Sequence, residues 1–234
     1  MLAYGRNVAE KILKDENLRK KVKTIFIEKN FFQKIDSVWL KNEKLPLKVV
    51  EKKELDRLSN GKHQGIIIDM EDYQYTPIAD LFKEDISFIL ILDHIEDPHN
   101  LGAMIRTAVA AGVDAIIMPS DRQVGVNATV LKASAGTLYD TKVVQVVNLN
   151  HTIELLKKEG FWFYGAAMNG EDYRKVDYAS KVALVIGNEG KGLSKLITKN
   201  CDFLISIPMK NNVESLNASV ACSLLLYEVV RNRK

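Results

Sequence analysis

The sequence predicts an α/β protein in which helices cover both faces of a parallel sheet, preceded by a smaller α/β unit. From residue 87 onward, short apolar and often β-branched segments, typical of buried strands, alternate with helix-like segments. The first 75 residues show a shorter alternation of the same kind. A composition of 47% hydrophobic and 27% charged residues is ordinary for a globular protein and excludes disordered and fibrous chains.

The N-terminal part has helix-like residues at 8–18 and 51–58 and strand-like residues at 22–27 and 65–69. A polar, aromatic stretch follows and ends at Pro77. We therefore expect one domain at residues 1–72, a linker at 73–85 and a second domain at 86–234.

In the second domain, the expected strands are residues 88–92, 115–118, 143–147, 161–165, 182–186 and 203–207. The expected helices are residues 101–111, 128–134, 152–159, 193–199 and 217–232. Ligands of parallel α/β sheets bind beyond the carboxyl ends of the strands, so the loops after these strands are the places to look for chemistry.

Charge is distributed unevenly along the chain. Residues 1–75 hold 16 Lys and Arg against 12 Asp and Glu, whereas residues 76–234 hold 17 against 18. Basic clusters at residues 19–23 and 41–48 suit contact with the phosphates of a nucleic acid, and an ordinary lysine-rich surface fits them equally well.

No apolar run approaches the length of a membrane span, and the start of the chain has no signal-like apolar core, so we expect a cytoplasmic protein. Cys201 and Cys222 have neither paired spacing nor a His at ligand spacing. Both are expected to be reduced thiols of the core.

The first notable loop begins at Asp93 and runs into a helix-like segment. Pro98 and Asn100 suit a turn into a helix N-terminus. Arg106 lies about two turns further, on the face of Asn100 and Gly102, and this face could look into a cleft. A surface ion pair is the alternative role for Arg106, although its small neighbours indicate a closely packed helix.

The second loop, residues 187–194, has three glycines within six residues. Glycines allow backbone to approach a ligand closely and to take positive φ. The spacing fits neither a P-loop nor a dinucleotide fingerprint. A nucleoside contacted by main chain and a plain tight turn are both consistent with it.

The third segment joins Ile207-Pro208-Met209 to an apolar helix that begins near Ser215 and Asn217. Capping the free N–H groups of that helix is the ordinary role of such residues. Their hydroxyl and amide could also serve a substrate.

Together the three segments resemble the SpoU family, also called the TrmH family, of SPOUT RNA methyltransferases. The match is in type and order, at residues 97–102 with 106–108, then 187–193, then 207–209 with 215–221. Residues 5–8 and 63–66 also resemble the small ribosomal-protein-like substrate-binding domain of many members. With both domains present, the chain looks most like members that methylate a guanosine ribose in 23S ribosomal RNA.

The resemblance implies a deep C-terminal trefoil knot and a homodimer formed beside it. It implies S-adenosylmethionine as methyl donor, bent within the knot and held largely by backbone groups, with Gly187, Ile207 and Leu216 as main contacts. The cofactor-binding residues that it implies are Gly187, Asn188, Gly190, Gly192, Ile207, Pro208, Met209, Ser215, Leu216, Asn217 and Ala218.

The reaction that it implies is transfer of a methyl group from a sulfonium to a ribose 2'-hydroxyl, a weak nucleophile that must be oriented and deprotonated. The catalytic residues that the resemblance implies are Arg106, Asn100, Glu189, Ser215 and Asn217. Arginine is normally protonated, so Arg106 acts either as the base, as the resemblance implies, or by binding a phosphate and stabilising negative charge.

No metal is needed, since the sulfonium is already activated. His94 and His99 are then turn or packing residues, because no third ligand is evident. Three alternatives to the 23S guanosine remain: the same chemistry on tRNA, the same chemistry on the thiostrepton-site adenosine of 23S RNA, or a non-catalytic RNA-binding module in ribosome assembly.

Overall fold

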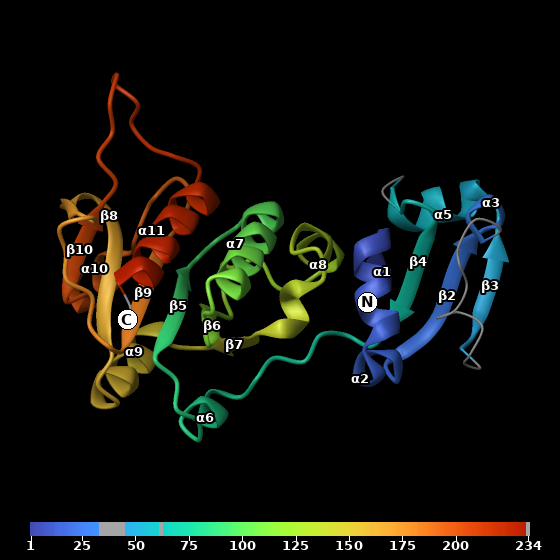
Figure 1. Cartoon of the computed structure of the whole chain (residues 1–234), viewed down its shortest axis with the longest axis horizontal. Helices are drawn as coiled ribbons and strands as arrows, with labels where there is room; N and C mark the ends of the chain where they lie inside the picture. The colour runs from blue at the N-terminus through green and yellow to red at the C-terminus, as the bar shows by residue number, and fades with distance from the viewer. Residues whose placement is uncertain (33–44, 61–62, 233–234) are drawn as a thin grey trace. The chain divides into compact units, whose positions relative to one another are not determined.

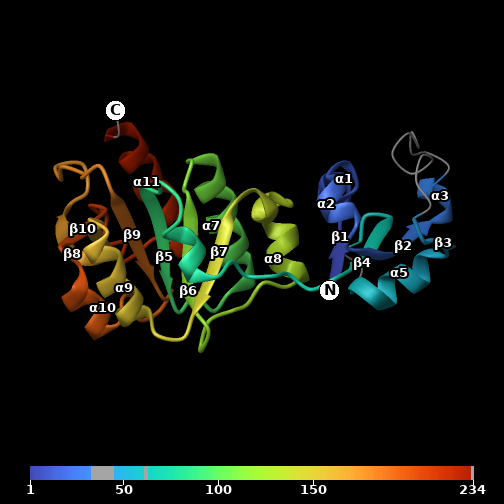
Figure 2. The same ribbon diagram turned by 90° about the horizontal axis from the view of Figure 1, so that it is seen from below.

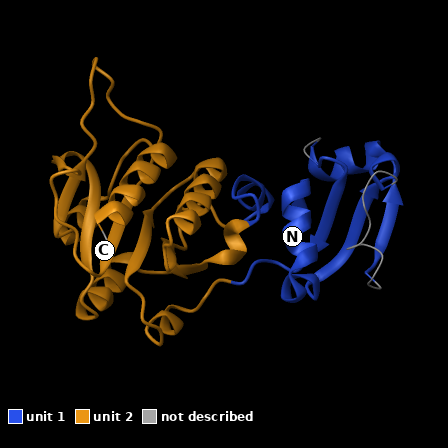
Figure 3. Ribbon diagram, viewed as in Figure 1, with its two compact units in different colours: residues 1–74, 126–136 blue, residues 75–125, 137–234 orange. Residues whose placement is uncertain are grey.

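The computed structural model describes residues 1–32, 45–60 and 63–232, which form two compact units (Figure 3). The first unit comprises residues 1–74 with 126–136, and the second comprises residues 75–125 with 137–234. Residues 126–136 contain α8 (Ala128–Ala133), which packs against the first strand of the chain. The domain limits expected at 1–72, 73–85 and 86–234 stay a prediction.

The first unit is a four-stranded mixed sheet with helices (Figure 1). Its strand order is β1 (Leu2–Tyr4), β4 (Ile66–Met70), β2 (Val22–Glu28) and β3 (Leu47–Val50). Strand β4 is antiparallel to both neighbours, and β2 is parallel to β3. Its helices within the described residues are α1 (Arg6–Lys14), α2 (Glu16–Arg19), α3 (Lys29–Phe32) and α5 (Lys52–Ser59), together with α8.

The single helix expected at residues 8–18 is divided in two. Asp15 has extended backbone, and its carboxylate accepts the N–H groups of Asn17 and Leu18. It therefore caps α2 and separates it from α1. Of the basic clusters, residues 19–23 run from α2 into β2, whereas residues 41–44 lie outside the described residues.

The second unit is built on a six-stranded sheet in which every pairing is parallel. The strand order is β10 (Phe203–Ser206), β8 (Trp162–Asp172), β9 (Val182–Gly187), β5 (Phe88–Asp93), β6 (Ala115–Pro119) and β7 (Lys142–Val146). Each expected strand exists, which confirms the parallel sheet.

Helices cover both faces of this sheet, as Figures 1 and 2 show. On one face lie α7 (Pro98–Ala110) and α11 (Ala218–Asn232). On the other lie α6 (Ile78–Leu81), α9 (Leu149–Lys158) and α10 (Lys195–Asn200), and a 3₁₀ turn (Thr137–Asp140) precedes β7. The α/β fold class with two covered faces is therefore confirmed.

Burial explains why the central strands are apolar except at their carboxyl ends. Every residue of β5 and β9 is buried. Alternate residues of β5, such as Ile89 and Ile91, pack into one core cluster with Leu149 of α9 and Phe163 of β8. A strand enclosed by helices on both faces has no polar side to offer.

Strand β8 runs seven residues beyond the end expected at Gly165. Its pairing with β10 jumps from Gly165 beside Leu204 to Glu171 beside Ile205. A Cβ atom on Gly170 would lie 2.5 Å from the backbone of Leu204, so only glycine allows this close passage. Residues 166–169, which lie between these two pairings, line a cavity at the carboxyl ends of β8, β9 and β10. The trefoil knot itself stays a prediction.

No helix in the described ranges is long and apolar enough to cross a membrane.

Candidate active site

A cavity of about 650 Å³ opens at the carboxyl ends of β8, β9 and β10. This volume and this place in a parallel sheet are typical of a small-molecule site. Its lining comes from residues 166–169, 186–193, 205–209 and 213–216, with Thr198 and three residues of α11, Ala218, Ala221 and Leu225.

The glycine loop, residues 187–193, forms one wall of the cavity. Asn188 and Gly192 exchange two backbone hydrogen bonds, of 3.1 and 2.9 Å, and Gly192 has φ +66°. A Cβ atom on Gly187 would lie 2.2 Å from the carbonyl carbon of Gly192. The loop is thus a tight turn and a cavity wall at once, and only glycine fits at its first position.

The side chain of Asn188 forms hydrogen bonds both within the glycine loop and to residues outside it. Its Oδ1 accepts the N–H groups of Gly190 and Lys191, at 3.0 and 3.1 Å. Its Nδ2 donates to the carbonyl of His94 at 2.8 Å and to Glu96 at 3.2 Å. The loop is therefore tied to the segment that follows β5.

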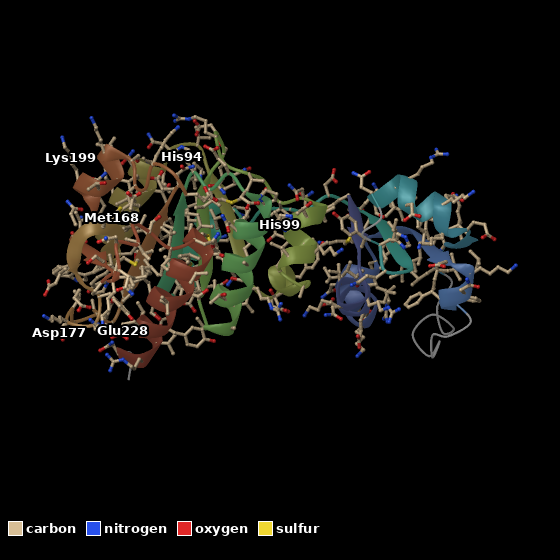
Figure 4. The ribbon with its side chains drawn as sticks, turned by 90° about the horizontal axis from the view of Figure 1, so that it is seen from above. His94, His99, Met168, Asp177, Lys199 and Glu228 are labelled. Atoms are coloured by element: carbon tan, nitrogen blue, oxygen red, sulfur yellow. The ribbon has the colours of Figure 1, made fainter. Side chains whose placement is uncertain are left out.

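Helix α7 begins at Pro98, three residues before the expected start. Asp97 caps it by accepting the N–H of His99, and Pro98 at the first position lacks the N–H that would need a partner. This early start puts Asn100 in the first turn, with only 7% of its surface exposed. His99, labelled in Figure 4, is exposed in the same turn.

A chain of hydrogen bonds joins three predicted site residues. Asn217 Nδ2 donates to Asn100 Oδ1 at 3.0 Å, and Asn100 Nδ2 donates to Glu189 Oε1 at 3.0 Å. Glu189 also lies 3.4 Å from the backbone N–H groups of Glu96 and Asp97. The structure thus connects all three motif segments through polar side chains.

The start of α11 confirms one of the two capping roles. Asn217 Oδ1 accepts the N–H of Ser219 at 2.9 Å and the hydroxyl of Ser219 at 2.6 Å. Asn217 is therefore the cap, with both polar atoms of its side chain engaged. Ser215 lines the cavity and has no hydrogen-bond partner among the described residues.

Arg106 stands apart from this group. Its side chain is exposed, is absent from the cavity lining, and has neither a hydrogen bond nor an ion pair with any residue that the structure describes. Its helix, α7, packs on α11, where Ser223 donates to Thr107 at 3.2 Å. A single chain therefore does not bring Arg106 into the cavity.

The expected cofactor-binding residues line the cavity, with the exception of Asn217. Sequence reasoning missed the wall formed by residues 166–169, because the strand was expected to end at Gly165. Met168, labelled in Figure 4, is 77% exposed there. The small residues Gly165-Ala166-Ala167 were the available signal, since they leave room beside a ligand.

Neither cysteine is ionised near neutral pH. Burial raises the pKa of Cys201 to about 12, and burial also raises the pKa of Cys222. Both thiols are free. Within the described ranges, no group of three or more His, Cys, Asp or Glu side chains is arranged to hold a metal ion.

Comparison with known proteins shows the family to which the chain belongs. The family model described as SpoU rRNA Methylase family matches residues 87–227. The chain belongs to the SpoU family. A second family model, described as RNA 2'-O ribose methyltransferase substrate binding, matches residues 2–76. The resemblance drawn from the three motif segments is thereby confirmed, and the protein is an RNA methyltransferase of the SpoU/TrmH family.

Relatives from several bacteria are similar over most of their length. A putative TrmH family tRNA/rRNA methyltransferase of Staphylococcus aureus is 46% identical over 199 residues, covering 82% of this chain and 80% of the relative. One from Bacillus subtilis is 45% identical over the same coverage.

Solved structures of SpoU-type enzymes share the fold. An AdoMet-bound rRNA methyltransferase from Sinorhizobium meliloti matches 98% of this chain and 86% of its own, with a TM-score of 0.77 and 25% identity. The SpoU methyltransferase AviRb from Streptomyces viridochromogenes matches 99% and 89%, with a TM-score of 0.80 and 22% identity.

Proposed function

We propose that this protein transfers a methyl group from S-adenosylmethionine to a ribose 2'-hydroxyl of RNA. The observation that carries the proposal is the hydrogen-bonded chain from Asn217 through Asn100 to Glu189, beside a cavity walled by the glycine loop. The match of residues 2–76 to an RNA 2'-O ribose methyltransferase substrate-binding model supports the choice of acceptor.

The cavity fits the methyl donor. Its volume of about 650 Å³ suits a nucleoside-sized ligand, and the close passage at Gly187 leaves main-chain groups at its wall. When bound, S-adenosylmethionine supplies an activated methyl group. We assign its binding to Gly187, Asn188, Gly190, Gly192, Ile207, Pro208, Met209, Ser215, Leu216 and Ala218. Asn217 supports them as the cap of α11.

The polar side chains of the site differ in how many of their hydrogen-bonding atoms are already engaged within the protein. Asn217 and Asn100 use their amides on one another, on Glu189 and on the helix cap. Ser215, with its unengaged hydroxyl, and the exposed carboxylate of Glu189 retain acceptor capacity. We infer that Ser215 and Glu189 contact the substrate nucleotide, and that Asn100 and Asn217 hold them in position.

Arg106 has a protonated guanidinium with five donors and no partner among the described residues. Such a group suits a phosphate or the negative charge that develops on the ribose oxygen. Action as a base remains the alternative, and the two roles predict different behaviour of a lysine substitution.

A homodimer is the proposed assembly. Val220, Leu224 and Tyr227 are 48%, 42% and 51% exposed on α11, spaced so that they share one face. A second copy packed on this face would remove them from water. Because α7 packs on α11, the same contact would offer Arg106 to the other copy's cavity.

The proposed substrate is a guanosine of 23S ribosomal RNA, and the action is proposed to be cytoplasmic. Mapping of ribose 2'-O-methyl groups in total RNA from cells with and without the gene tests this. Loss of one methyl group in 23S RNA is expected. Loss of a methyl group from tRNA, or from an adenosine of 23S RNA, would identify that RNA as the substrate instead. If no methyl group is lost and the protein fails to bind S-adenosylmethionine in calorimetry, the chain is a non-catalytic RNA-binding module.

A further inference from the structure

Asp93 is the last residue of β5 and its side chain is almost completely buried, with 1% of its surface exposed. In the sheet it lies directly beside Gly187, the first residue of the glycine loop. Burying a carboxylate is costly unless hydrogen bonds compensate. The bonds that compensate here lead to both ends of the glycine loop.

At the far end of the loop, Asp93 Oδ2 accepts the backbone N–H of Ser194 at 2.7 Å. At the near end, Asp93 Oδ1 lies 2.6 Å from Nδ1 of His94. The carbonyl of His94 in turn accepts the Nδ2 of Asn188 at 2.8 Å. One buried carboxylate therefore fixes where the glycine loop leaves β9 and where it enters α10.

His94 takes this position at a conformational cost. Its backbone φ is +64°, a region that residues other than glycine rarely adopt, and its Nε2 is buried without a partner. Such strain persists only where surrounding contacts hold it. The ring contact with Asp93 and the carbonyl contact with Asn188 are the contacts that hold it here.

We propose that Asp93 is a positioning residue that holds the glycine loop, through Ser194 and His94, in the shape that binds the methyl donor. The proposal rests on the proposed function, since it takes the ligand of the cavity to be S-adenosylmethionine. Asp93 itself is absent from the cavity lining, so its effect passes entirely through the loop.

The opposite end of β5 supplies a matched control. Asp114 Oδ2 accepts the backbone N–H groups of Ser87 and Phe88, both at 2.8 Å, at the amino end of the strand. It therefore performs the same kind of strand-end hydrogen bonding away from the cavity. A purely structural role predicts that Asp93 and Asp114 variants behave alike.

The test compares the wild type with the variants Asp93→Ala, Asp93→Asn and Asp114→Ala. For each protein we measure the Kd for S-adenosylmethionine by calorimetry, the KM for RNA and the unfolding temperature. We expect Asp93→Ala to raise the donor Kd by about ten-fold or more, the effect of losing one charge-assisted hydrogen bond. The KM for RNA should rise as well, because the glycine loop also carries Glu189, which we infer to contact the nucleotide. Asp93→Asn keeps one acceptor oxygen and should give an intermediate Kd. Asp114→Ala should lower the unfolding temperature and leave the donor Kd unchanged.

A donor Kd within two-fold of wild type in a folded Asp93 variant would overturn the proposal, as would an equal rise in Asp114→Ala. If Asp93→Ala does not fold, Asp93→Asn decides alone. Calorimetry needs no RNA, so a wild-type protein that binds the donor and methylates no RNA would overturn the proposed function and leave this test intact.

Discussion

Asn217 donates its amide hydrogen to Asn100 at 3.0 Å and so joins the first turns of α11 and α7, which lie 117 residues apart in the chain. The same side chain caps α11 through its oxygen. One residue thus stabilises a helix and orients the polar chain that ends at Glu189.

Substitutions at this residue should separate the two roles. Asn217→Ala removes both the cap and the bond to Asn100, so it should lower the free energy of unfolding by about 1 kcal/mol and abolish most activity. Asn217→Asp keeps the cap but cannot donate to Asn100. It should unfold as the wild type does and still lose activity. Chemical denaturation with a methyl-transfer assay measures both, and a fully active Asn217→Asp enzyme would show that the polar chain has no role.

The glycine loop should tolerate a methyl group at one glycine and reject it at another. A Cβ atom on Gly187 would lie 2.2 Å from backbone, whereas one on Gly190 meets nothing closer than 3.8 Å. Gly187→Ala should therefore abolish S-adenosylmethionine binding. Gly190→Ala keeps the main-chain groups through which Gly190 would contact the donor, so it should bind within a few-fold of wild type. Calorimetry on both purified variants measures this. Equal binding by the two would contradict the described loop geometry.

Arg106 should affect activity without affecting stability. Its side chain is exposed and has no partner among the described residues, so Arg106→Ala should change the free energy of unfolding by less than about 0.5 kcal/mol. The methylation rate should fall by about 100-fold or more. Arg106→Lys keeps the positive charge, so partial activity with an unshifted pH profile would indicate charge stabilisation. A rate that instead follows the ionisation of the lysine would indicate a base.

The exposed face of α11 should be needed for the dimer. Leu224→Asp places a charge where an apolar contact is proposed, and should shift the protein from dimer to monomer in light scattering. Leu196 on α10 is 55% exposed and provides the control, since Leu196→Asp should remain dimeric. A dimer that survives Leu224→Asp at micromolar concentration would place the interface elsewhere.

The thiol of Cys201 should be unreactive in the folded protein. Burial raises its pKa from 9.0 to about 12, so almost none is thiolate at pH 8. Iodoacetamide should label it only after denaturation, as mass spectrometry would detect. In the unfolded chain this thiol ionises near pH 9, whereas in the folded protein it ionises only near pH 12. Its contribution to the free energy of unfolding is therefore fully present below pH 9 and is lost as the pH rises toward 12. Rapid labelling of native protein at pH 8 would contradict the burial.

The sequence predicted the elements well where local pattern is decisive. The central strands β5 and β9 of the second unit are buried on both faces, and a run of β-branched and apolar residues is a signal that each of these strands carries by itself. The division of the first helix at Asp15 was missed, because a capping carboxylate within an amphipathic pattern looks like one more polar residue.

For the site, the sequence predicted some relationships between residues and missed others. Asn100, Glu189 and Asn217 were expected to act together, and they do share hydrogen bonds. Arg106 was expected beside them because it shares a helix face with Asn100, but the structure leaves it outside the cavity of its own chain. Helical spacing gives the face of a residue but not the element that covers that face.

For the three motif loops, the sequence by itself determined their order, their residue types and their place after buried strands, because strand burial and turn chemistry are local properties. Only the tertiary structure decided which loops meet. The bond from Asn217 to Asn100 and the bond from Ser194 to Asp93 depend on strand order and on which strand ends lie side by side. Those relationships arise from packing between segments about a hundred residues apart, which no local pattern encodes.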